Sequence, residues 1–146
     1  MHVRTIALAA ATAAALLLSA APVYAEMLAF TATLDGQQEV PPNDSAGTGK
    51  LEATYDTDSR LFKWTITYAG LTGDAVAAHF HGPADPGANA APVVPIPDDR
   101  LASPIEGEAT LDDAQAADLQ AGKWYFNVHT AQYPDGEIRG QLTQAQ

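Results

Sequence analysis

The residues best suited to chemistry are three histidines in two short segments, His79 and His81 in one and His129 in the other. Successive side chains of a β-strand point to opposite faces, so His79 and His81 would project from the same face, about 6.5–7 Å apart. Imidazoles at this spacing suit a divalent ion such as Cu(II) or Zn(II). The chain has no cysteine, which excludes thiol nucleophiles, iron–sulfur clusters and cysteine-ligated zinc.

The segment that carries His129, residues 123–130, alternates large apolar side chains with polar ones, as a half-buried strand does. The turn at residues 134–136 predicts a hairpin with the segment that follows. By this alternation, one polar face of the hairpin comprises Tyr125, Asn127, His129, Glu137 and Arg139. The sequence thus predicts a metal site if this hairpin lies beside the strand of His79 and His81.

In that site His79, His81 and His129 are the expected ligands, and Glu137 is an auxiliary ligand or orients them. Tyr125, Asn127 and Arg139 would tune the site through hydrogen bonds or contact a partner. The same pattern also fits polar side chains on a solvated sheet face, hydrogen-bonded to their neighbours. A calcium site, a serine hydrolase and a glycosidase all lack a supporting pattern.

Charge and composition limit the possible partners. The chain has 7 basic and 18 acidic residues and a formal net charge of −11, so its field would repel nucleic acid.

Residues 1–25 are typical of a signal peptide, with Arg4, an apolar stretch and a small-residue cleavage site after Ala25. No later run is apolar enough to span a membrane. We therefore expect a periplasmic or secreted protein without a transmembrane segment after cleavage.

The elements that must position the histidines are short strands. Runs rich in β-branched and aromatic residues, separated by turn residues, predict strands near 27–34, 47–56, 61–68, 74–81, 105–111, 123–130 and 137–142. Residues 82–101 are rich in proline and predict a long loop with one short edge strand near 92–96. A short helix is expected near 112–121. Residues 26–146 would then form a single all-β domain, an antiparallel Greek-key, immunoglobulin-like β-sandwich of about seven to eight strands.

Four motifs in order resemble the CHRD domain, a family named for its repeats in chordin and also found as single-domain exported bacterial proteins. They are residues 34–42 followed by Gly47-Thr48-Gly49, residues 78–84, residues 121–130 and residues 134–141. The resemblance covers about residues 28–142 and implies an immunoglobulin-like or similar β-sandwich in an extracellular or periplasmic setting. It brings no settled activity. The family's recurring polar positions correspond to His79, His81, Asn127, His129, Glu137 and Arg139.

These observations favour an exported CHRD binding protein with a histidine-rich copper or zinc site, and not an enzyme. Nucleotide, flavin, haem and iron–sulfur cofactors are not expected. One alternative is a metal-free interaction or matrix module that binds another exported protein. A second is a mononuclear-copper oxidoreductase whose architecture resembles copper–zinc superoxide dismutase, although three histidines are too few for the metal sites of that enzyme, and its disulfide cannot form without cysteine.

Overall fold

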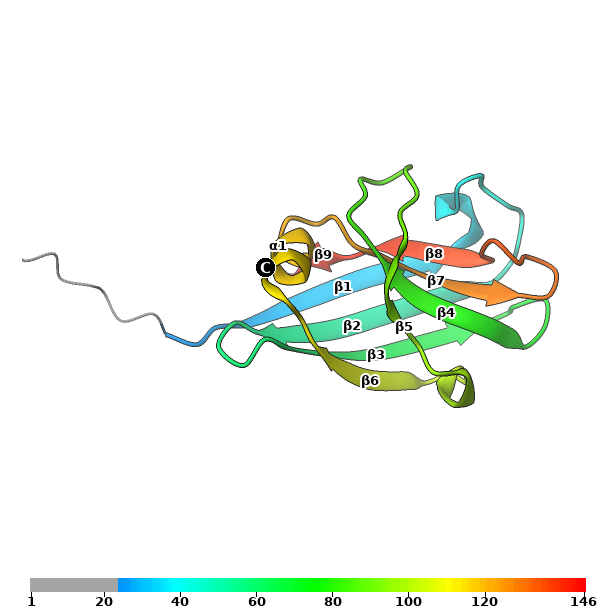
Figure 1. The fold of residues 1–146 in the computed structure, drawn as a ribbon. Helices are drawn as coiled ribbons and strands as arrows, with labels where there is room; N and C mark the ends of the chain where they lie inside the picture. Colours follow the sequence, from blue (N-terminus) through cyan, green and yellow to red (C-terminus); the bar gives the residue numbers. More distant parts are fainter. Residues whose placement is uncertain (1–23) are drawn as a thin grey trace, which may run out of the picture.

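The computed structural model describes residues 24–146, which form nine strands, one α-helix and two short 3₁₀ turns (Figure 1). The strands are β1 Met27–Asp35, β2 Thr48–Asp56, β3 Leu61–Ala69, β4 Ala75–His81, β5 Pro92–Pro95, β6 Ile105–Thr110, β7 Tyr125–Thr130, β8 Ile138–Gln141 and β9 Thr143–Gln144. The helix α1 spans Asp113–Gln120, and the turns are η1 Gly36–Gln38 and η2 Asp98–Arg100. The expected signal peptide lies outside the described residues, apart from Tyr24 and Ala25.

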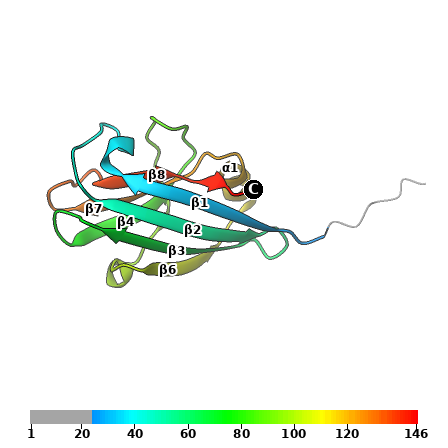
Figure 2. The ribbon, with the colours of Figure 1, turned by 180° about the vertical axis from the view of Figure 1, so that it is seen from behind.

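The strands form one hydrogen-bonded antiparallel sheet in the order β5-β4-β7-β8-β1-β2-β3-β6, with β9 also paired to β1. The sheet curls, so that β1, β2 and β3 face the viewer in Figure 2 and β4 and β7 lie behind them. The predominantly β fold is thus confirmed. The two separate sheets of a Greek-key sandwich are not confirmed, because Asp35 of β1 pairs with Arg139 of β8 and joins the two halves into one series.

Aromatic side chains fill the space inside the curled sheet. Phe62 on β3 packs edge-on against Phe80 on β4, with ring centroids 5.2 Å apart, and against Trp124 just before β7, at 5.7 Å. Each of these rings is buried. Burial of an aromatic side chain contributes a few kcal/mol, about 1.5–3 for a phenylalanine. The core therefore holds β3 and β4, which are not neighbours in the sheet, at a fixed separation.

The helix α1 confirms the predicted helix near residues 112–121. Asp112 caps its first turn, because the Asp112 side chain accepts from the Gln115 backbone N–H and the Gln115 side chain accepts from the Asp112 N–H. Leu119 is buried against the core, and Gly122 follows with a positive φ of 73°, the conformation that ends helices. Within residues 24–146, no helix is both long and apolar enough to cross a membrane.

Candidate metal centre

The pairing of β4 with β7 brings the three histidines together. His79 lies opposite Asn127, His81 opposite Tyr125 and His129 opposite Ala77. All three imidazoles project from the outer face of the sheet, and one ring nitrogen from each lies within 4.8 Å of the others. His81 is 8% exposed, whereas His79 and His129 are half-buried. The predicted proximity of these residues is therefore present in the fold.

Two of the imidazoles are oriented by backbone carbonyls. The Nδ1 atom of His81 lies 2.8 Å from the Ala90 oxygen, and that of His129 lies 2.8 Å from the Pro134 oxygen. A carbonyl oxygen only accepts, so each Nδ1 donates its hydrogen to it. In the neutral imidazoles the lone pair then sits on Nε2. This outward hydrogen bond from the non-ligating nitrogen is the usual support of a metal-binding histidine.

The Nε2 atoms of His81 and His129 both face the side-chain oxygen of Asn127. The Oδ1 atom of Asn127 lies 2.9 Å from His81 Nε2 and 3.0 Å from His129 Nε2. The Nδ1 atom of His79 lies 3.2 Å from His129 Nε2. With neutral imidazoles, the two Nε2 atoms and Oδ1 are all acceptors. A His79 tautomer with its hydrogen on Nδ1 can donate to His129 Nε2, but Oδ1 has no hydrogen to offer His81 Nε2. Such a group of atoms attracts a cation.

The surroundings of the cluster disfavour the protonated form of two of its imidazoles. Burial lowers the pKa of His79, and the nearby imidazoles of His129 and His81 lower it further. Burial also lowers the pKa of His81, against the opposing effect of its hydrogen bonds with Ala90 and Asn127. Because only the neutral imidazole offers a lone pair, the lowered pKa values of His79 and His81 favour the form of these two side chains that can bind a metal.

Tyr125 and Arg139 support the cluster from the side. The Tyr125 ring stacks on His81, with centroids 4.6 Å apart and planes 5° from parallel, and the Arg139 guanidinium lies 3.5 Å from the Tyr125 centroid. The guanidinium also donates to Asn89 Oδ1 at 2.9 Å and the Ala88 oxygen at 2.6 Å. These contacts fix the loop that follows β4 over the outer face of β7. That loop supplies the Ala90 oxygen that orients His81.

Glu137 does not join the histidines, which corrects the position expected from the sequence. Its carboxylate is fully buried and accepts hydrogen bonds from Ser45 Oγ at 2.6 Å, the Thr72 N–H at 2.8 Å, Thr72 Oγ1 at 2.9 Å and Thr130 Oγ1. Burial raises the pKa of Glu137, but these hydrogen bonds outweigh it and lower the pKa below its usual value. Glu137 precedes the first residue of β8, where the alternation of a regular strand does not hold. Its carboxylate instead joins Thr130 to the loops before β2 and before β4.

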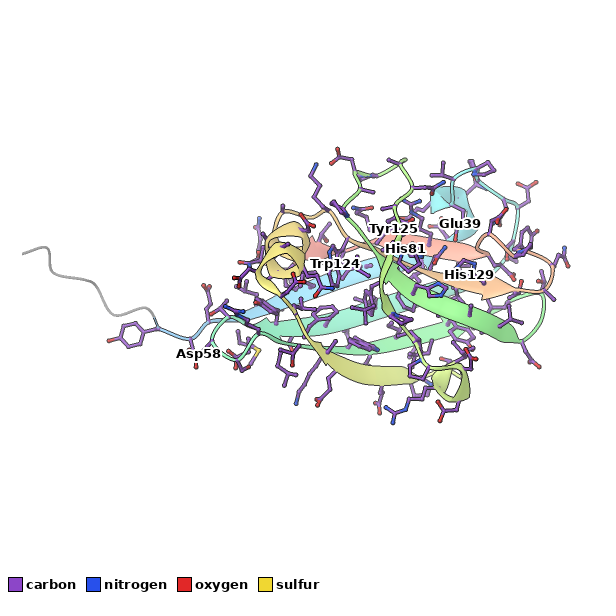
Figure 3. All side chains as sticks on the ribbon, viewed as in Figure 1. Glu39, Asp58, His81, Trp124, Tyr125 and His129 are labelled. Atoms are coloured by element: carbon purple, nitrogen blue, oxygen red, sulfur yellow. The ribbon has the colours of Figure 1, made fainter. Side chains whose placement is uncertain are left out.

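A buried carboxyl beside the Asn127 amide belongs to Glu39, which the sequence did not identify as a site residue. Glu39 follows η1 and is 5% exposed, and its Oε1 packs beside Asn127 Nδ2 at the point where a Cβ on Gly136 would lie. Figure 3 shows Glu39 on the same side of the sheet as His81, Tyr125 and His129. Burial raises its pKa to about 7, against opposing effects of Arg139 and Asn127. The only sequence signal was a glutamate directly before Val-Pro-Pro, a pattern also typical of a strand end.

Comparison with known proteins relates the chain to a protein family. The family model of the CHRD domain matches residues 30–142, a range that includes all three histidines, Glu39, Asn127 and Arg139. No curated protein and no solved structure matches the chain significantly. Because the match extends from within β1 to the end of β8 and beyond, it covers most of the sheet described above, and the chain belongs to the CHRD domain family.

Proposed function

We propose that this chain is an exported CHRD-domain binding protein that holds a divalent metal ion, copper or zinc, through His79, His81 and His129. One observation carries the proposal. The Nε2 atoms of His81 and His129 both lie about a hydrogen-bond length from Asn127 Oδ1, while their Nδ1 atoms are committed to carbonyls. His79 Nδ1 can donate to His129 Nε2, but the two acceptors His81 Nε2 and Asn127 Oδ1 need a positive centre between them, which either a metal ion or a proton can provide.

The donor set points to the borderline metals. Three imidazole nitrogens without a thiolate suit Zn(II) or Cu(II), and a three-histidine set leaves a further coordination position for water or another ligand. Magnesium and calcium prefer oxygen ligands, and Glu137 is turned away from the cluster. The bound ion would act as a Lewis acid or redox centre. The chain itself would orient the imidazoles of His81 and His129 through Ala90, Pro134 and Asn127.

Export is the second component of the proposal. Residues 1–25 have the composition of a signal peptide, and the remaining residues carry the acidic excess of the chain. We place the functional domain at residues 26–146 and expect it in the periplasm or outside the cell. Mass spectrometry of the protein recovered from the envelope would show whether the chain begins at Glu26.

Metal analysis and titration test the metal site. The purified domain is stripped with chelator, reloaded with Cu(II) or Zn(II) in the presence of a competing chelator, and analysed for bound metal. We expect a single ion per chain, and none in the variant in which all three histidines are replaced by alanine. Asp58→Ala is the matched control, because Asp58 is exposed in the β2–β3 turn, far from the histidines in Figure 3.

Folding of each variant is checked by circular dichroism and urea unfolding. A folded triple variant that binds the ion as tightly as the unaltered domain would overturn the proposal. Failure of the unaltered domain to retain either ion would overturn it as well.

A further inference from the structure

The amide of Asn127 lies between the histidine cluster and the buried carboxyl of Glu39. Its Oδ1 end faces the Nε2 atoms of His81 and His129. A side chain built on Gly136 would collide with both Glu39 Oε1 and Asn127 Nδ2, so these two atoms pack against the same point of the β7–β8 turn. The two ends of one amide therefore meet two different groups, the imidazoles and the carboxyl.

The two ends of an amide are not equivalent. The Nδ2 end has two hydrogens and can donate one to each neutral Nε2, which would satisfy both lone pairs without any ion. The Oδ1 end has no hydrogen, so it leaves the lone pair of neutral His81 Nε2 without a donor and suits that nitrogen only when a metal ion or a proton lies there. The amide orientation thus selects between a cluster that is satisfied when empty and one that needs a positive centre.

Glu39 decides between these orientations. When ionised, its carboxylate accepts but does not donate, so it favours the Nδ2 end of Asn127, which packs beside it at Gly136, and leaves Oδ1 for the histidines. Glu39 Oε1 is buried and has no hydrogen-bond partner among residues 24–146. A buried carboxylate oxygen without a donor carries an energetic penalty, which strengthens the preference of Glu39 for the amide N–H. Arg139 is the nearby cation, but no ion pair within 4.0 Å joins it to Glu39 among the described residues.

We infer that Glu39 is a positioning residue of the metal site, holding Asn127 with its oxygen toward the ligating imidazoles. The inference rests on the proposed metal function and adds a residue that makes no hydrogen bond to the three ligands within residues 24–146. Without this carboxylate, Asn127 would rotate its Nδ2 end to the histidines and stabilise the metal-free cluster. Metal affinity would then fall although all three imidazoles are intact.

The test is a double-mutant cycle on Zn(II) affinity, measured with a competing chelator. Supporting groups of this kind typically change metal affinity about 10–100-fold, so we expect Glu39→Leu to weaken Zn(II) binding by about tenfold. In the Asn127→Ala background, the same substitution is expected to change affinity by less than about twofold, because the amide through which Glu39 acts is absent. An effect of equal size in both backgrounds would show that Glu39 acts through its charge or through the fold, and would overturn the inference.

Glu39→Gln provides the conservative comparison and a variant of nearly the same shape. The substituted glutamine side chain would still offer an oxygen to Asn127 Nδ2, so we expect this variant to retain Zn(II) affinity within about threefold of the unaltered domain. A loss as large as that of a folded Glu39→Leu protein would contradict positioning by hydrogen bonding. If Glu39→Leu does not fold, a tenfold loss of Zn(II) affinity in Glu39→Gln would by itself contradict positioning by hydrogen bonding. Absence of Zn(II) binding by the unaltered domain would instead refute the proposed function itself.

Discussion

Replacement of Glu39 by glutamine should make the domain progressively more stable than the unaltered protein as the pH rises. The Glu39 carboxyl is 5% exposed, and burial raises its pKa from 4.5 to about 7. The folded protein therefore holds the proton of Glu39 more tightly than the unfolded chain does. The contribution of this group to stability is fully present below pH 4.5 and is lost as the pH rises through 7.

The magnitude follows from the displacement of the pKa. One pKa unit corresponds to about 1.4 kcal/mol, so the change from 4.5 to about 7 corresponds to roughly 3 kcal/mol of unfolding free energy. Glutamine keeps the shape of the side chain but does not ionise. The free energy of unfolding of Glu39→Gln minus that of the unaltered protein should rise by this amount between about pH 4 and pH 8.

Urea unfolding at a series of pH values, with chelator present to exclude metal, measures this difference directly. Taking the difference removes the titration of groups common to both proteins. Glu106→Gln is the matched control, since it removes one negative charge from an exposed position on β6. A difference for Glu39→Gln that stays flat, or that falls as the pH rises, would refute the burial argument.

Three further outcomes are expected. Gly140→Ala should destabilise the domain by about 2 kcal/mol or more in urea unfolding, because a Cβ there would collide with the backbone oxygen of Thr33; Gly73→Ala, where the space is open, should change little. Asp112→Ala should lower stability by about 1 kcal/mol and reduce helical circular dichroism, because it removes the cap of α1. Burial lowers the pKa of His81, so the contribution of this residue to the free energy of unfolding is present above pH 6.5 and is lost as the pH falls. Metal-free His81→Gln should therefore lose less stability on acidification than the unaltered domain. An equal or greater loss in urea unfolding would contradict this.

The sequence predicted those parts of the site that depend on strand alternation. His79, His81, Asn127 and His129 lie within regular strands, and their side chains share the outer face as the period of two requires. Glu137 shows where this reasoning ends, because it lies before β8 and its carboxylate turns to Ser45, Thr72 and Thr130 instead.

Glu39 and the Ala90 oxygen could not be placed from the sequence, since loops deliver both to the site. The loop after β4 is held by His81 on β4 and Arg139 on β8, and the loop after η1 is joined to it by the hydrogen bond from Asn89 to the Val40 oxygen. The same limit applied to the sheet. Individual strands followed from local patterns, but the pairing of β1 with β8 joins residues about a hundred positions apart, and no local pattern specifies it.

The two ends of the curled sheet bear on how copies of this protein behave in concentrated solution. An unpaired strand edge is a template for strands from another molecule, and it invites polymerisation. Here β5 begins and ends with prolines, Pro92 and Pro95, which have no N–H to donate. At the other end, two copies meeting along β6 would bring Glu106 and Glu108 of each chain against those of the other. Both edge strands of the sheet, β5 and β6, therefore disfavour edge-to-edge pairing with another copy of the chain.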